Sequence, residues 1–103
     1  MSRAVTRSSP LLLTDQSRIV AGKDQVSRDL AGEMAILNLE DGVYYSLNPV
    51  GASVWHLIQE PRTFAALRDA LLDEYDVEAI RLESDLRTLL AQLAENGLID
   101  VTR

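Results

Sequence analysis

The chain has 103 residues, of which 47% are hydrophobic and 25% are charged. That length suffices for one compact domain and is too short for two ordinary ones. The net charge of -6 makes nucleic acid an unfavourable partner, because the phosphates would be repelled. The absence of cysteine excludes disulfides, thiol catalysis and cysteine-based zinc sites.

The N-terminal region shows no sustained hydrophobic period. Residues 1–18 mix Ser, Arg and Thr, and we expect a flexible arm that is either disordered or pairs with the sheet or a second copy. Residues 19–103 are expected to form the folded domain. No apolar run approaches the roughly 20 residues that cross a bilayer. The apolar run at 11–13 is too short for a signal peptide, so we expect a cytoplasmic protein without membrane contact.

Three strands are predicted before residue 48. A short strand is expected within residues 19–30, the strongest strand pattern follows at 34–39, and a third strand occupies 43–47. Residues 40–42 read Glu-Asp-Gly, a composition typical of the tight turn of a β-hairpin.

Two registers are possible for this hairpin. A two-residue turn pairs Leu39 with Tyr44, whereas a three-residue turn with Gly42 in the left-handed conformation pairs Leu39 with Val43. We prefer the second register because it gathers apolar residues on one face that can be buried. That face carries Ala35, Leu37, Leu39, Val43, Tyr45 and Leu47.

Three helices are predicted after the strands. Asn48 caps the first, Thr63 caps the second, and the third opens at Asp76 or Glu78 and ends at 96–97. Strands followed by helices indicate an α+β domain, a three-stranded antiparallel sheet followed by three helices in a winged-helix-like arrangement. The inward stripe of the first helix comprises Val50, Val54, Leu57 and Ile58. The stripe of the third comprises Leu82, Leu86, Leu89, Leu90 and Leu93.

Candidate catalytic and metal-binding residues are few. His56 is the only histidine, and on the first helix it is expected to be exposed. The acidic residues at 73–78 match no calcium-loop spacing and are better explained by helix capping. We therefore expect a protein that is not an enzyme and that has no cofactor and no metal.

The third strand is the most informative element. If the strands form a meander, residues 43–47 are an edge strand, and edges are usually blunted by Lys, Pro or a bulge. This segment contains no Lys or Pro. A loop, the N-terminal arm or a dimer partner could cover the edge, or a peptide could add to it as a further strand. The residues alone leave these alternatives open.

Residues 25–100 resemble the PqqD-like family, small domains that recognise the leader segments of ribosomally synthesised, post-translationally modified peptides. The resemblance implies a winged-helix-like fold to which the leader adds as a strand, between the third strand and the third helix. It is carried by Gly32-Glu33, Leu37-Asn38-Leu39, Asp41-Gly42, Tyr44-Tyr45-Ser46-Leu47-Asn48, Gly51, Trp55, Arg62-Thr63, Tyr75, Asp85-Leu86 and Asn96-Gly97-Leu98-Ile99.

The resemblance also implies a function. A non-catalytic protein, monomer or dimer, would bind a leader peptide and present the precursor to a leader peptidase or other modifying enzyme. The pattern is closest to the stand-alone proteins of lasso-peptide pathways. The alternatives are a PqqD-type chaperone for a radical enzyme in pyrroloquinoline quinone synthesis and a self-pairing structural module. The implied leader-binding residues are Val43, Tyr44, Tyr45, Ser46, Leu47, Leu82, Asp85, Leu86 and Leu89.

Overall fold

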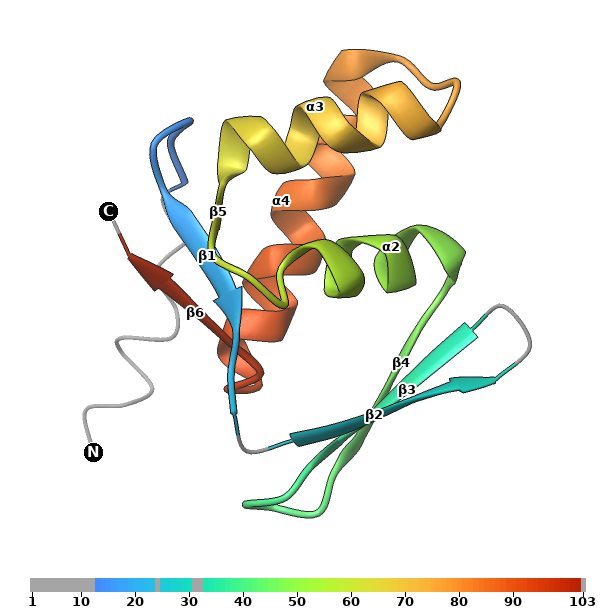
Figure 1. The fold of residues 1–103 in the computed structure, drawn as a ribbon, viewed down its shortest axis with the longest axis vertical. Helices are drawn as coiled ribbons and strands as arrows, with labels where there is room; N and C mark the ends of the chain where they lie inside the picture. The colour runs from blue at the N-terminus through green and yellow to red at the C-terminus, as the bar shows by residue number, and fades with distance from the viewer. Residues whose placement is uncertain (1–12, 24, 31–32, 103) are drawn as a thin grey trace.

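The computed structural model describes residues 13–23, 25–30 and 33–102. Within them the chain forms two three-stranded antiparallel sheets and three helices, which confirms the α+β class (Figure 1). The winged-helix likeness stays a prediction. None of the described helices is both long and apolar enough to cross a membrane. The elements are β1 (Arg18–Ala21), β2 (Gln25–Leu30), β3 (Glu33–Asn38), β4 (Tyr44–Leu47), α2 (Pro49–Leu57), β5 (Arg62–Thr63), α3 (Phe64–Glu74), α4 (Ala79–Glu95) and β6 (Ile99–Thr102).

One sheet is the predicted meander, β2-β3-β4, with β3 in the centre and β4 at the edge. Both predicted registers of its second hairpin are wrong. Met34 pairs with Leu47 and Ile36 with Tyr45, so residues 39–42 form the turn. A slip of one residue from the preferred register turns the other face of β3 to the core. Met34 and Ile36 are accordingly buried, whereas Leu39 is 58% exposed.

The burial of Asn38 explains why the apolar pattern predicted the wrong hairpin register. Its side chain faces inward and is only 7% exposed. Its Oδ1 accepts the Glu40 N–H at 2.9 Å, and its Nδ2 donates to the Asn96 carbonyl at 3.2 Å. These hydrogen bonds allow a polar side chain to be buried at little cost. Gly42 keeps the predicted left-handed conformation, with φ of 71°, but in a longer turn than expected.

The second sheet, β5-β1-β6, was not predicted. In it β1 pairs with β6 along its whole length, from Arg18 opposite Thr102 to Ala21 opposite Ile99. The short strand β5 pairs with the other side of β1. The residues after α4 therefore form a strand, and Ile99 is only 5% exposed.

The predicted helix caps are confirmed. At the start of α2 the Asn48 side chain accepts the Gly51 N–H at 2.8 Å, and at the start of α3 the Thr63 side chain accepts the Ala66 N–H at 3.1 Å. The third helix, α4, ends before Gly97, whose φ of 73° is typical of a helix C-terminus.

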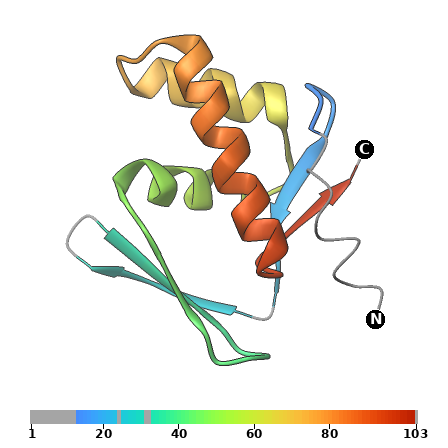
Figure 2. The same ribbon diagram turned by 180° about the vertical axis from the view of Figure 1, so that it is seen from behind.

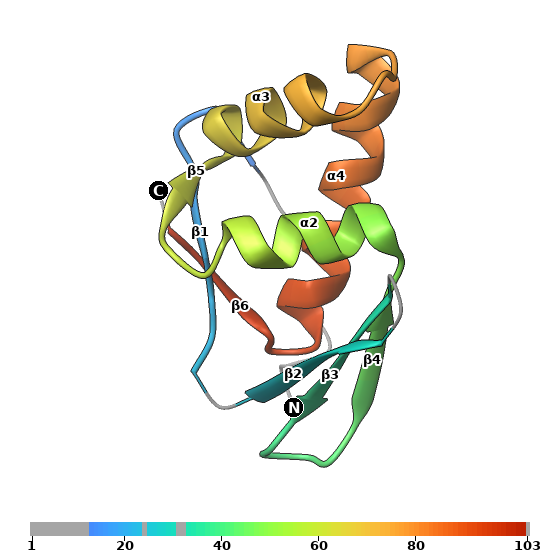
Figure 3. The ribbon, with the colours of Figure 1, turned by 45° about the vertical axis from the view of Figure 1, so that its right-hand side comes forward.

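The helices pack around one core. Figure 3 shows α2 lying between the meander and α3 and crossing in front of α4. Val54 and Ile58 of the predicted α2 stripe are buried, whereas Leu57 is half-buried and Val50, on the side that faces α4, is still 38% exposed. The leucine stripe of α4 is buried as predicted, except that Leu89 is half-buried.

Residues 13–17 pack against α3 and α4 before β1 begins. Leu13 and Ser17 are buried, and Arg87 donates to the Leu13 carbonyl at 2.7 Å. The Arg87 guanidinium also lies 4.7 Å from the centre of the Phe64 ring. Most of the expected arm, residues 1–18, lies outside the described residues, and the division of the chain at residue 18 stays a prediction.

Candidate peptide-binding site

The free edge of β4 lies on the same side of the molecule as α4 (Figure 2). At the start of the ladder the Asn38 N–H donates to the Val43 carbonyl at 3.0 Å. Because successive residues of an antiparallel strand point their main-chain groups to opposite sides, the N–H and C=O of Tyr44 and Ser46 point away from β3. No described residue forms a hydrogen bond with these groups. The edge is therefore able to accept an added strand.

The predicted site residues of this strand differ in what they offer. Tyr44 is 69% exposed on the outer face, and Ser46 is exposed on the same face. Tyr45 points inward and is half-buried, whereas Leu47 belongs to the core. Val43, 52% exposed, lies in the loop just before β4. An added strand would thus meet the outward main-chain groups of β4 and the accessible Tyr45 side chain, whereas Leu47 is almost fully buried.

Tyr45 connects β4 to α4. Its hydroxyl donates a hydrogen bond to Gln92 Oε1 at 2.9 Å. Burial raises the pKa of Tyr45 above its usual value of 10.0, and the negative charge of Glu95 raises it further. The phenol therefore stays protonated at neutral pH and remains a donor. No spacing in the sequence predicted this contact.

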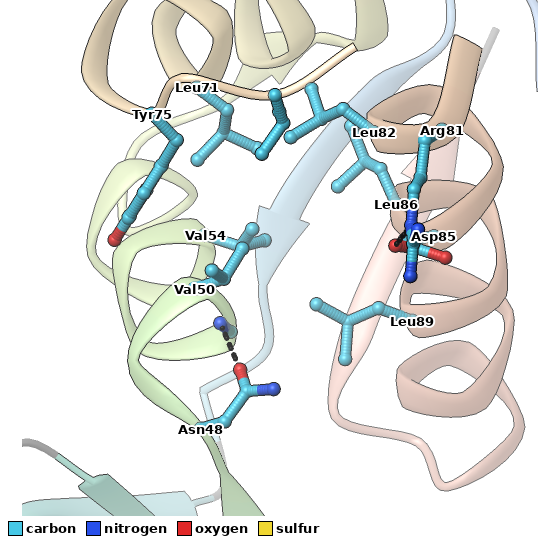
Figure 4. A pocket seen from close by; sticks show the side chains of 12 residues that line it. Asn48, Val50, Val54, Leu71, Tyr75, Arg81, Leu82, Asp85, Leu86 and Leu89 are labelled. Carbon is cyan, nitrogen blue, oxygen red and sulfur yellow. Dashed lines mark hydrogen bonds and ion pairs between the residues drawn. The ribbon is translucent and has the colours of Figure 1, made fainter. Parts of the chain in front are cut away.

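A cavity of about 280 Å³ lies between α2, the end of α3 and α4 (Figure 4). Figure 4 shows Leu82, Leu86 and Leu89 pointing from α4 toward Val50 and Val54 of α2. All four predicted α4 residues, Leu82, Asp85, Leu86 and Leu89, line the cavity. The other lining residues are Asn48, Val50, Gly51, Val54, Leu71, Tyr75, Val77 and Arg81. Its volume suits one or two apolar side chains better than a whole small-molecule ligand.

The mouth of the cavity is apolar with one charged rim. Val50 and Val77 line it and are 38% and 46% exposed. Arg81 and Asp85 form an ion pair at 4.0 Å on the rim, and their side chains are 79% and 77% exposed. Such an exposed pair contributes little to stability, so both charges are available to a ligand.

The sequence reasoning missed the contribution of α2. Asn48 was assigned only a capping role, and Val50 was assigned to the core. The available signal was Gly51, because a Cβ there would lie 3.2 Å from side-chain atoms of Leu47. The first turn of α2 thus approaches the end of β4 closely, and this places the cavity next to the edge strand.

The polar groups near the cavity are few, and several of them are already engaged. No group of three or more potential metal ligands occurs among the described residues. Tyr75 is engaged by Ser53, with 2.7 Å between their hydroxyl oxygens. His56 is exposed, as expected, and lies 3.9 Å from Asp29 rather than in the cavity. What the site combines is an open strand edge, an apolar cavity and a charged rim.

The chain matches one protein-family model and is similar in fold to solved structures. Residues 33–99 match the family model described as coenzyme PQQ synthesis protein D (PqqD). The structure of TbiB1 in complex with the TbiA(beta) leader peptide is 32% identical, with a TM-score of 0.72 over 79% of this chain and 94% of that one. The structure of lasso peptide synthetase B1 complexed with the leader peptide is 24% identical, with a TM-score of 0.69 over 80% and 96% of the two chains, and supports the fold alone. No curated protein matches the chain.

Proposed function

Because the chain belongs to the PqqD family, we propose that it is a recognition protein that binds the leader segment of a precursor peptide by β-strand addition. The observation that carries the proposal is the open edge of β4 beside the apolar cavity. The relative TbiB1, 32% identical, forms a complex with a leader peptide. Lasso-peptide biosynthesis is therefore the pathway that we assign to the chain.

Main-chain pairing would supply affinity with little dependence on leader sequence. The outward N–H and C=O groups of Tyr44 and Ser46 are the pairing groups, and each hydrogen bond contributes about 1 kcal/mol net. An added strand turns alternate side chains toward α4. One of these side chains, placed in the cavity against Leu86 and Leu89, would contribute about 2 kcal/mol if it is large and apolar.

Charge would add selectivity at the rim. Residues 33–61 contain four acidic residues and no Lys or Arg. Asp85 and Glu78 lie at the N-terminal end of α4 and are exposed. A basic or neutral leader is therefore favoured, and a leader Lys or Arg is the natural partner of Asp85.

In this proposal the protein performs no chemistry itself. It holds the leader in the cytoplasm and presents the attached precursor to a separate leader peptidase or other modifying enzyme. A PqqD-type role beside a radical enzyme in pyrroloquinoline quinone synthesis is the second candidate, since the matching family model carries that description.

Calorimetric titration with leader peptides tests the proposal. The TbiA(beta) leader and the leader of the pyrroloquinoline quinone precursor are the two first probes, because they separate the two candidate pathways. We expect saturable binding of one peptide per protein for a lasso-type leader. Failure of the folded protein, checked by circular dichroism, to bind either class of leader would overturn the proposal. Binding of only the second leader would favour the second candidate.

A further inference from the structure

The Tyr45–Gln92 hydrogen bond joins β4 to α4 near two hollows of different size. The larger is the 280 Å³ cavity, which reaches Leu89 of α4, one helical turn before Gln92. The smaller lies beside the hairpin turn and is lined by Tyr45 itself, together with Val43, Asn96 and others. Tyr45 therefore borders the small hollow, while its partner Gln92 follows the α4 wall of the cavity by one turn.

The pairing of the sheet determines which leader side chains would meet this bond. Tyr45 and Leu47 point to the inner face of the meander, two residues apart. A strand added to β4 places one inward side chain opposite each of them. The side chain opposite Leu47 is nearest to the cavity, since Asn48, the next residue, lines it. The side chain opposite Tyr45 lies over the hydrogen bond.

The chemistry at the second position differs from that of the cavity. The Tyr45 hydroxyl uses its proton on Gln92, and its oxygen can still accept. The Gln92 side-chain N–H groups have no described partner. A large apolar side chain placed here would cover these groups and leave them without water, which is costly. An acidic side chain would be repelled by Glu95, whose charge already acts on Tyr45.

We propose that Tyr45 and Gln92 form a second selectivity element that accepts a short, uncharged polar leader side chain, two residues from the large apolar side chain that fills the cavity. This inference rests on the proposed function. It adds a spacing rule for the leader. A large apolar residue lies at the cavity, any residue follows, and a short polar residue comes next in the direction of the hairpin turn.

Selection from a displayed library of random peptides tests the rule, because the selection requires no natural leader sequence. The wild-type protein should enrich peptides with a large apolar and a short polar residue two positions apart. Tyr45→Phe and Gln92→Ala should keep the apolar preference and lose the polar one. Thr88→Ala is the matched control on α4, because the Thr88 hydroxyl donates to the carbonyl of Ser84 in its own helix.

A pair of enriched peptides gives the quantitative test. Replacing the short polar residue by Leu should weaken binding to the wild-type protein about fivefold, and this ratio should fall to about one in both variants. Enrichment without the two-residue spacing, or an unchanged ratio in Tyr45→Phe, would overturn the spacing rule and leave strand addition standing. Enrichment of no peptide by the folded wild-type protein would overturn both.

Discussion

The two small sheets of this domain contrast in construction and in exposure. The sheet β5-β1-β6 joins segments from both ends of the described chain, and its central strand carries Ile19, which is fully buried. The meander β2-β3-β4 is built from consecutive hairpins, and its strand β4 has one unpaired edge within the described residues. The first sheet joins the two ends of the described chain, and the second carries the edge of the proposed site.

The meander contains a further contrast of its own. Both β2 and β4 are edge strands, but β4 ends one residue before Asn48, which lines the cavity, and its Tyr45 donates a hydrogen bond to Gln92 of α4. An open edge alone supplies main-chain hydrogen bonds to any strand, which invites aggregation. An edge beside an apolar cavity supplies both affinity and selection. Variants that affect one sheet, or one edge, without the other can test these distinctions.

The largest effect is expected from Ile19→Ala in the first sheet. Removing a fully buried Ile side chain should lower the free energy of unfolding by about 3 kcal/mol. Leader affinity of the folded fraction should not change, because Ile19 lies in the other sheet and does not line the cavity. Val26→Ala is the control in the meander, since Val26 is 50% exposed and should cost less than about 0.5 kcal/mol. Urea unfolding of both variants measures the difference.

Ser46→Pro should have the opposite result, with leader binding lost and the fold kept. Proline removes the outward N–H of Ser46, and its ring obstructs the approaching strand, so affinity should fall at least about thirtyfold. Proline is tolerated where the N–H faces away from the sheet.

The matched control is Ser27→Pro on β2. Ser27 is an exposed serine of β2. Its main-chain N–H and C=O also face away from β3, because the neighbouring residues Val26 and Arg28 are the ones whose main-chain groups face β3. Calorimetry should show unchanged leader affinity for this variant. Equal losses for the two proline variants, each folded by circular dichroism, would mean that the β4 edge has no special role.

Leu89→Ala should weaken leader binding by a smaller amount, about fivefold, because the cavity loses part of its apolar wall. Ile80→Ala removes a similar side chain from the same helix at a position that is 86% exposed and outside the cavity. Titration of both variants with the same leader should show the loss only for Leu89→Ala. A comparable loss for Ile80→Ala would contradict the assignment of the cavity.

Asp85→Ala should have the smallest effect, about threefold or less at low salt, because exposed charge pairs are weak. The loss should disappear in high salt, where exposed charges are screened. Asp73→Ala, an exposed acidic residue of α3 outside the cavity, serves as the control for net charge. A loss that persists in high salt would show that Asp85 makes a buried contact instead.

Local signals in the sequence predicted the meander and the helices. Turn residues, caps and periodic leucines act over a few positions, so Gly42, Thr63 and the α4 stripe could be read directly. The second sheet could not be read in this way. Its strands β1 and β6 are each four residues long and lie near opposite ends of the chain. They are not joined by a hairpin turn, so no local signal indicates that they pair.

The site was predictable where it follows from helix spacing and not where it depends on tertiary packing. The α4 residues Leu82 and Leu86, which the resemblance implied as leader-binding residues, share a helix face, and both line the cavity. Val50 is apolar and has the helical spacing of a core residue. It is nevertheless partly exposed, because the cavity separates it from α4. The hairpin register was mispredicted for a similar reason, since one of the two hydrogen bonds that make the burial of Asn38 favourable comes from the distant Asn96.

Amide hydrogen exchange with and without a bound leader tests strand addition most directly. The account predicts that the N–H groups of Tyr44 and Ser46 become protected when the peptide binds, while those of Ser27 and Asp29 on the opposite edge keep their exchange rates. A leader that binds tightly and leaves the exchange of Tyr44 and Ser46 unchanged would contradict it.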